Sequence, residues 1–277
     1  MEVWNLSGSA DEAIKRFRTF EEGEPDLIKT GIKPVDASIG GLFPGSCGVV
    51  GMATGVGKSS LMLASALSSS ESVGIISCED TPDVVGSRAL AWASGVNSRK
   101  LRTKHLSDQD KADIAVGRDR LDSTNVLVTY AIGAPVKTIL DCVNALAEAG
   151  CRLIWLDYLQ KVRGVMEDRR NEVSTIYTQF QYACAQNECA GMVISQFSRQ
   201  DPTKEPQIYW LKESGDIENE ARLIILGNRS AEDADTVYCR VAKSTFGGEN
   251  IRFSYKRDSA GILREVVNRE EDDFSDF

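Results

Sequence analysis

The chain has 277 residues, of which 42% are hydrophobic and 26% are charged. This suits a soluble globular protein with one large α/β domain, or two small domains. No stretch approaches the roughly 20 apolar residues that a membrane-spanning helix needs, and the N-terminus lacks the layout of a secretory signal, so we expect a cytoplasmic protein with no membrane partner. The net charge of −9 argues against a surface that binds nucleic acid everywhere, but it allows a local basic patch.

Seven cysteines are scattered along the chain, mostly inside apolar runs. An odd number at irregular spacing predicts buried, reduced thiols. Cys184 and Cys189 have the wrong spacing for a zinc knuckle, and the single histidine, His105, has no second ligand nearby in the sequence. A structural metal site is therefore not expected.

Residues 1–25 are expected to form an N-terminal arm. Ala13, Phe17 and Phe20 recur at helical spacing, which predicts a short amphipathic helix from Ser9 to Glu22. Glycines and prolines follow, first in Glu21–Pro25 and then between Thr30 and Gly45. Such residues are typical of turns ahead of a domain.

From Ser46 onward, apolar runs of strand length alternate with helical stretches. Near-continuous apolar runs predict strands buried on both faces, and hence a mostly parallel central sheet flanked by helices over residues 26–267. Asn250–Tyr255 and Gly261–Val266 predict an antiparallel hairpin at the sheet edge. The other predicted strands are Cys47–Gly51, Val73–Ser77, Val126–Thr129, Leu153–Leu156, Met192–Ser195, Leu223–Leu226 and Val237–Ala242.

Val49–Ser60 (VVGMATGVGKSS) predicts a buried strand, a glycine-bearing loop and a helix that begins at Lys58. Amides in such a loop wrap phosphate oxygens, and the helix N-terminus adds partial positive charge. Lys58 would neutralise the β- and γ-phosphates of ATP or another nucleoside triphosphate, and the Ser59 hydroxyl would ligate Mg²⁺. The predicted nucleotide-binding residues are Gly55, Val56, Gly57, Lys58, Ser59 and Ser60.

This P-loop departs from the usual pattern in one place. Met52 stands where a glycine or alanine is normal, five residues before the second glycine, and Gly51 comes one residue earlier. The alternative is a chance Gly-Lys-Ser in a surface loop, but the predicted strand and helix on either side favour a P-loop.

Three polar residues follow later strands and predict the chemistry. Glu79 ends a strand about twenty residues after Lys58, where a carboxylate can reach the water that attacks a γ-phosphate; alternatively, Glu79 or Asp80 caps the next helix. Asp157 ends an apolar strand, as does the aspartate that holds the Mg²⁺ shell in P-loop NTPases, although strand-terminal aspartates are also common in turns. Gln196, at a further strand end, is a candidate γ-phosphate sensor or simply a polar residue at a strand exit.

In this order, the residues resemble the RecA-like domain of DnaB-type hexameric replicative helicases and of phage primase-helicases. Thr30–Asp36 (TGIKPVD) resembles the segment before the P-loop of that family, and Asp157–Gln160 (DYLQ) its Mg²⁺-site strand end. Ser195–Arg199 (SQFSR) is similar to its γ-phosphate sensor. Leu211–Ala221 (LKESGDIENEA) resembles the loop and helix that line its central channel, and it is the most discriminating stretch.

The resemblance implies a RecA-like P-loop core and a role for each matching residue. Glu79 would polarise the attacking water, Asp157 would act on Mg²⁺ and Gln196 would sense the γ-phosphate. Lys243 would reach the γ-phosphate of a neighbouring subunit. The predicted DNA-binding residues are Lys212, Glu213 and Gly215 in the channel loop, with Arg163 and Arg199 as further backbone contacts at strand ends.

The pattern fails two residues after Lys243, where the family has an arginine finger and this chain has Thr245. An arginine supplied in trans can be worth about 10³ to 10⁵ in rate, so its loss puts turnover in doubt but leaves nucleotide binding intact. Arg240 and Arg252 are candidate substitutes, or alternatively solvated residues on a strand face.

The expected function is that of a replicative DNA helicase subunit, which hydrolyses ATP with Mg²⁺ and moves along single-stranded DNA as a homohexamer in a bacterial or phage-infected cell. The arm would dock on an adjacent subunit or pack on its own domain. Residues 268–277 form an acidic tail that would recruit a polymerase, primase or loader, or only aid solubility. The rivals are a RecA-like recombinase or regulatory ATPase, and a nucleotide-binding adaptor ring with little turnover.

Overall fold

The computed structural model of the chain describes residues 26–103, 105–163, 169–197, 205–211, 217–229 and 233–266, with the backbone alone at 169–171. The predicted arm and the acidic tail lie outside these residues, so both stay predictions. The same holds for the predicted DNA contacts Lys212, Glu213, Gly215 and Arg199.

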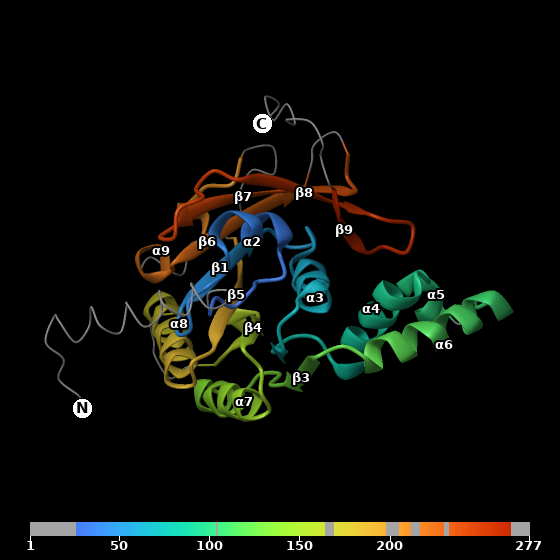
Figure 1. Cartoon of the computed structure of the whole chain (residues 1–277), viewed down its shortest axis with the longest axis horizontal. Helices are drawn as coiled ribbons and strands as arrows, with labels where there is room; N and C mark the ends of the chain where they lie inside the picture. The colour runs from blue at the N-terminus through green and yellow to red at the C-terminus, as the bar shows by residue number, and fades with distance from the viewer. Residues whose placement is uncertain are drawn as a thin grey trace, which may run out of the picture.

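The described strands form one sheet in the order β3-β2-β4-β5-β1-β6-β7-β8-β9 (Figure 1). Neighbouring strands from β3 to β6 are parallel, whereas β7, β8 and β9 pair antiparallel. The strands are β1 Cys47–Met52, β2 Val73–Ser77, β3 Val126–Tyr130, β4 Leu153–Asp157, β5 Ala190–Gln196, β6 Leu223–Arg229, β7 Thr236–Ser244, β8 Arg252–Arg257 and β9 Leu263–Val266. The predicted α/β fold and the C-terminal hairpin are thus confirmed, and the antiparallel part begins one strand before the hairpin, at β7.

Helices cover both faces of the sheet. On one face lie α2 Lys33–Ile39 and α3 Lys58–Ser68, and on the other lie α7 Val136–Glu148, α8 Arg169–Gln186 and α9 Ile217–Glu220 (Figure 1). Side chains alternate between the faces of a strand, so Val50 packs with α3 while Val49 packs with α8. This arrangement explains the continuous apolar run of β1, because both of its faces are buried.

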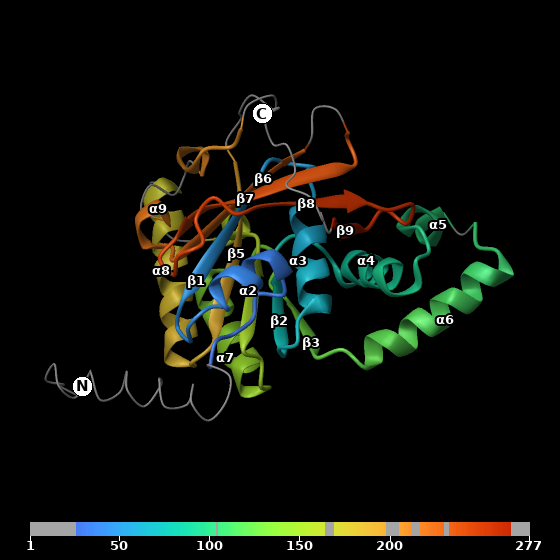
Figure 2. The same ribbon diagram turned by 45° about the horizontal axis from the view of Figure 1, so that its top comes forward.

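Three helices lie together at one end of the molecule, beyond the β2–β3 side of the sheet (Figures 1 and 2). They are α4 Pro82–Ser94, α5 Ser98–Thr103 and α6 Asp108–Asp122. Among the described residues, no helix has both the length and the hydropathy that crossing a membrane requires.

One strand differs from its prediction. The apolar run at β3 predicts burial on both faces, but Leu127 is 44% exposed and Tyr130 is 38% exposed. The reason is the place of β3 at the edge of the sheet, which has no neighbouring strand beyond it. The prediction for cysteine is confirmed: all seven are free thiols, and all except the half-buried Cys142 are buried.

The segment that begins at Thr30 is fixed to the P-loop helix α3. Both carboxylate oxygens of Asp36 accept backbone hydrogen bonds, from Thr30 at 2.8 Å and from Gly31 at 2.9 Å. The Ser65 hydroxyl in α3 donates to the Thr30 carbonyl oxygen at 2.5 Å. Gly31 has a φ of 76°, and a Cβ there would lie 2.3 Å from the Ser65 carbonyl oxygen. Glycine is required at this position, since no side chain fits between the two segments.

Candidate nucleotide-binding site

Four neighbouring parallel strands end around one open cavity of about 540 Å³. In sheet order, β2 leads to Glu79, β4 ends at Asp157, β5 ends at Gln196 and β1 leads into the P-loop. Ligands of α/β proteins bind at such carboxyl ends of strands. The cavity is lined by residues that include Thr54, Lys58, Ser59, Glu79, Arg88, Tyr158, Gln196 and Arg257. The structure therefore brings Lys58, Ser59, Glu79 and Gln196 together, with Asp157 directly behind them.

The P-loop has the backbone that a phosphate-binding loop needs. Gly55 and Gly57 have φ angles of 78° and 132°, which favour glycine, and α3 begins at the next residue, Lys58. The departure at Met52 is accommodated because its side chain is fully buried in the core, where its Cε packs over Gly227 on β6. Met52 thus leaves the loop clear of its side chain.

Asp157 is the buried anion of the site. Its side chain is only 2% exposed, and burial raises its pKa to about 6, although a hydrogen bond from the Ser59 hydroxyl opposes the rise. Its Oδ1 atom has no hydrogen-bond partner among the described residues. A carboxylate oxygen without a partner, beside a serine hydroxyl, is the donor set that a hard cation such as Mg²⁺ prefers. Ser59 and Asp157 therefore fit the predicted metal site.

Lys58 is held close to its own loop. Its Nζ donates to the Ala53 carbonyl oxygen at 3.1 Å. Burial lowers the pKa of Lys58, whereas the negative charges of Asp157 and Glu79 oppose this effect. The ammonium group is thus available to an anion that replaces the Ala53 carbonyl as its partner.

Glu79 faces the cavity and does not cap the helix that follows it. Helix α4 begins at Pro82, with Thr81 in the N-cap position, so the capping alternative for Glu79 and Asp80 is wrong. Glu79 Oε1 lies 3.4 Å from Lys161 Nζ, and about half of the carboxylate side chain is exposed to the cavity. A carboxylate in this place is in reach of a water molecule in the cavity.

Gln196 is held by the 3-10 turn Leu159–Lys161, which follows the neighbouring strand β4. The Gln160 amide donates to Ser195 Oγ at 2.9 Å, and its oxygen accepts a bond from the Gln196 backbone N at 3.3 Å. The side chain of Gln196 donates to the Thr54 hydroxyl in the P-loop. This explains the glutamine in the DYLQ stretch, because one side chain ties the ends of β4 and β5 together.

Three arginines around the P-loop were missed by the sequence reasoning. Arg88 in α4 lines the cavity and pairs with Asp80, and Arg257 lines it from the end of β8. Arg229, at the end of β6, donates to the Gly55 carbonyl oxygen at 2.6 Å. Arg88 could have been found from the sequence, because it lies in the predicted helix that directly follows Glu79. Arg229 and Arg257 come close to the P-loop only because strands distant in the sequence pair in the sheet.

The remaining predicted residues lie away from this cavity. Lys243 donates to the carbonyl oxygens of Glu218 and Asn219 in α9, at 2.7 and 3.0 Å, and Thr245 is exposed. Arg163 is exposed and forms backbone hydrogen bonds with residues 134 and 136. Arg240 and Arg252, the candidate substitutes for an arginine finger, both pair with Glu205 of their own chain.

Comparison with known proteins agrees with this geometry. The chain is 27% identical over 214 residues to the replicative DNA helicase DnaC of Bacillus subtilis, covering 73% of this chain and 47% of the relative. It is 26% identical over 243 residues to the replicative DNA helicase DnaB of Geobacillus stearothermophilus, covering 82% and 54%. The chain thus spans about half the length of these curated relatives.

Solved structures show the same fold. The ATPase domain of G40P superposes with a TM-score of 0.83 at 20% identity, covering 94% of this chain and 99% of that one. A DnaB-like replicative helicase, described with its interactions with primase, gives a TM-score of 0.79 at 19% identity, covering 95% and 67%. The model of the DnaB-like helicase C terminal domain family matches residues 28–257. With this match over most of its length, and with its P-loop and strand-end carboxylates around one cavity, the chain belongs to the DnaB-like helicase C-terminal domain family.

Proposed function

We propose that this chain is the ATP-hydrolysing motor subunit of a replicative DNA helicase, which moves on single-stranded DNA as a homohexameric ring. The observation that carries the proposal is the convergence of Lys58, Ser59, Glu79 and Gln196 on one cavity at four adjoining strand ends. Asp157 lies directly behind them and accepts a hydrogen bond from Ser59. Membership of the family and the named helicase relatives support the reaction class.

Each residue has a task that follows from its position. The P-loop amides and Lys58 bind the phosphates. Lys58 exchanges its hydrogen bond to the Ala53 carbonyl oxygen for one to a phosphate oxygen. Ser59 and Asp157 would hold Mg²⁺, which would neutralise charge on the phosphates when bound. Glu79 accepts a hydrogen bond from the attacking water and orients it, and Lys161 holds the carboxylate in place. Gln196 contacts the terminal phosphate in place of its bond to Thr54.

The other side of the cavity suits the nucleoside. The same space as the P-loop is also lined by Arg257 at the end of β8, by Gly261 and Ile262 in the β8–β9 turn, and by Ser98 in α5. With the phosphates bound at Lys58, the base and ribose would extend toward these residues. Few of these groups can read a particular base edge, which fits acceptance of ATP or another nucleoside triphosphate.

Assembly and DNA binding are the next parts of the proposal. Lys243 lies outside its own cavity, which supports a role at the nucleotide of a neighbouring subunit. Lys212, Glu213 and Gly215 would contact the DNA backbone, with Arg163 and Arg199 in support. Six copies of one loop multiply the contacts of each subunit, so a net charge of −9 is no obstacle. The acidic tail, residues 268–277, would recruit a primase, polymerase or loader, in the cytoplasm of a bacterial or phage-infected cell.

One observation favours a second function, that of an adaptor ring that binds ATP but hydrolyses it slowly. Thr245 replaces the expected arginine finger, and Arg240 and Arg252 are both engaged by Glu205 in the same chain. A missing arginine finger lowers turnover far more than nucleotide binding. Such a ring would still assemble on DNA and recruit partners.

The test measures ATP hydrolysis with and without single-stranded DNA, together with strand displacement on a forked duplex. The helicase proposal expects DNA-stimulated hydrolysis and strand separation, and both should vanish in Lys58→Ala. ATP binding with no turnover in the intact protein would support the adaptor. Turnover and strand exchange without displacement of the fork would support a recombinase instead.

A further inference from the structure

One tyrosine side chain stays exposed between residues that are packed on the core. It belongs to the described segment 205–211, which contains the 3-10 turn Ile208–Trp210. Tyr209 lies in the middle of this turn and is 64% exposed, whereas Trp210 and Leu211 after it are buried. Ile208 before it packs against the same apolar cluster as Trp210 and Leu211. The ring of Tyr209 is therefore in water, while the residues on either side of it are held by the core.

The far end of this segment is fixed on the P-loop strand. A Cβ at Gly51 would lie 2.5 Å from Leu211 Cδ2 and 2.7 Å from Phe197 Cε1, so the glycine leaves the space that these two side chains fill. The Phe197 ring also meets the Trp210 ring edge-on, at a centroid distance of 5.8 Å. Trp210 and Leu211 are thus held by β1 and by the residue that follows β5.

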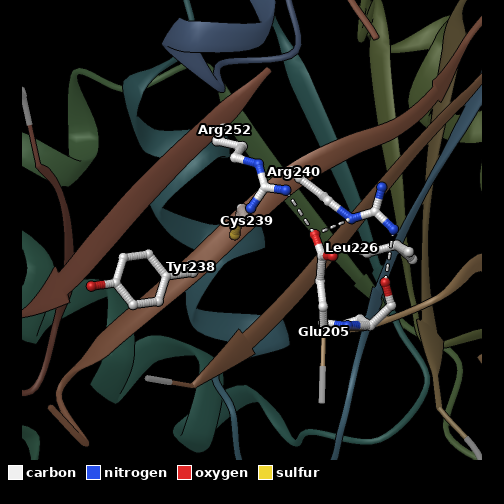
Figure 3. A pocket seen from close by; sticks show the side chains of 7 residues that line it. Glu205, Leu226, Tyr238, Cys239, Arg240 and Arg252 are labelled. Atoms are coloured by element: carbon white, nitrogen blue, oxygen red, sulfur yellow. Dashed lines mark hydrogen bonds and ion pairs between the residues drawn. The ribbon is translucent and has the colours of Figure 1, made fainter. Parts of the chain in front are cut away.

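The near end of the segment is tied to the antiparallel part of the sheet (Figure 3). Arg240 on β7 donates from Nη2 to the Pro206 carbonyl oxygen at 2.9 Å, and its Nε lies 3.0 Å from Glu205 Oε1. The Arg240 side chain is only 16% exposed, so salt screens this ion pair less than a pair on the surface. Because both ends are held, the backbone of Tyr209 has little freedom, and the ring keeps only the two rotations of its own side chain.

Tyr209 lies close in the chain to the residues that we propose as DNA contacts. Lys212 follows it by three residues, so the two Cα atoms are at most about 11 Å apart whatever conformation the chain adopts. A strand whose backbone contacts Lys212 therefore passes within reach of a side chain as long as that of tyrosine. The tyrosine ring carries no charge, so it neither repels phosphate nor competes with Lys212 for it.

The chemistry of an exposed, well-held tyrosine ring suits a nucleic-acid base. Contacts to phosphate alone leave the bases of a single strand in water, and every base has a π face on which an aromatic ring can stack. Stacking reads no particular base edge, which fits a motor that passes over any sequence. A ring with only two rotatable bonds also loses little conformational entropy when a base covers it.

We propose that Tyr209 is a stacking platform for a base of the single-stranded DNA, so that each subunit holds the strand by a base as well as by its phosphates. This rests on the proposed function, whose DNA contacts it extends from the backbone to the bases. Trp210 and Leu211 hold the stacking platform in place, and the ring of Tyr209 supplies affinity without sequence preference.

The test removes the ring and the bases, separately and together. Fluorescence anisotropy measures the affinity of the assembled protein, with a non-hydrolysable ATP analogue and Mg²⁺, for an oligothymidylate and for an abasic strand of equal length. We expect loss of the bases to weaken binding to the intact protein about tenfold or more, the size of one stacking contact. Tyr209→Ala should weaken binding of the oligothymidylate by a similar factor, and loss of the bases should then add less than about twofold. An equal effect of the bases in both proteins overturns the proposal.

Matched variants test whether the π face of the ring makes the contact. Tyr209→Phe keeps the ring and should bind as tightly as the intact protein, whereas Tyr209→Leu has no π face and should bind as weakly as Tyr209→Ala. Full affinity in Tyr209→Leu overturns stacking. Tyr182→Ala is the control, because Tyr182 on α8 is also 64% exposed, and it should change nothing. Mass photometry of Tyr209→Ala should show unchanged assembly; a loss of affinity that follows a loss of assembly places Tyr209 between subunits and overturns the proposal.

Photo-cross-linking makes the test independent of helicase activity. Iodinated uracil in a single strand cross-links to an aromatic side chain that stacks on it, and mass spectrometry of the digested protein locates the site. We expect the cross-link at Tyr209. Such a cross-link in a chain that hydrolyses no ATP supports the stacking platform while the helicase proposal fails. A chain that unwinds DNA but cross-links only at other residues overturns the stacking platform while the helicase proposal stands.

Discussion

Replacing Asp157 by asparagine is expected to stabilise the fold while it abolishes Mg²⁺-dependent nucleotide binding. Burial raises the pKa of Asp157 from 3.8 to about 6. Each pKa unit corresponds to about 1.4 kcal/mol, so the ionised carboxylate costs the native state up to about 3 kcal/mol at pH 8. Asparagine has nearly the same shape and keeps a partner for the Ser59 hydroxyl. We therefore expect Asp157→Asn to raise the free energy of unfolding by about 1 to 3 kcal/mol at pH 8.

The pH dependence of this gain has a definite sign. The folded-state pKa lies above the unfolded one, so between pH 4 and pH 6 the native state binds more protons than the unfolded state. Its stability consequently falls as the pH rises through this window. Below about pH 4 both states are protonated and the cost vanishes. At pH 5 the advantage of asparagine should be roughly half of that at pH 8.

Urea unfolding of both proteins at pH 5 and pH 8, without nucleotide, measures the gain, and calorimetry at pH 8 measures the affinity for a Mg²⁺–ATP analogue. Asp141→Asn is the control, because Asp141 is exposed on α7 and a surface change there is expected to shift stability by less than about 0.5 kcal/mol. A destabilised Asp157→Asn at both pH values, or one that keeps Mg²⁺-dependent affinity, would refute the interpretation of Asp157 as a buried anion that awaits a cation.

Two further predictions concern the supports of the site. Gly31→Ala should destabilise the fold by about 1 to 3 kcal/mol more than Gly95→Ala, as judged by urea unfolding. Both glycines have φ near 75°, but only at Gly31 does a Cβ meet a backbone atom, the Ser65 carbonyl oxygen; equal losses would show that the contact is unimportant. Gln160→Leu should lower kcat about tenfold or more with little change in ATP affinity, because the backbone of Gln196 loses its partner. An unchanged kcat would count against Gln160 as the support of the sensor.

The fold was largely predictable because its strands carry their own signature. Continuous apolar runs at β1, β2 and β4 gave their positions to within one or two residues, since strands buried on both faces tolerate few polar groups. The apolar pattern does not show which strand lies at the edge of the sheet, and so the predicted burial of β3 on both faces was wrong. The antiparallel direction of β7 was missed for a related reason, because the direction of a strand depends on its pairing and not on its composition.

The candidate site was predictable where short motifs mark strand ends. Lys58, Glu79, Asp157 and Gln196 were found because parallel strands bring their carboxyl ends to one edge. Arg229 and Arg257 could not be found in this way, since they reach the P-loop from strands far along the chain and no motif marks them. The pairing of Glu205 with two arginines is likewise a product of the tertiary fold.

The central claim is that the cavity around Lys58 binds a nucleoside triphosphate together with Mg²⁺. Isothermal titration calorimetry of the intact protein with a non-hydrolysable ATP analogue, with and without Mg²⁺, tests it most directly. We predict one site per chain, tighter binding with Mg²⁺ than without it, and loss of the signal in Lys58→Ala. Binding of equal strength in Lys58→Ala, or no binding to the intact protein, would contradict the claim.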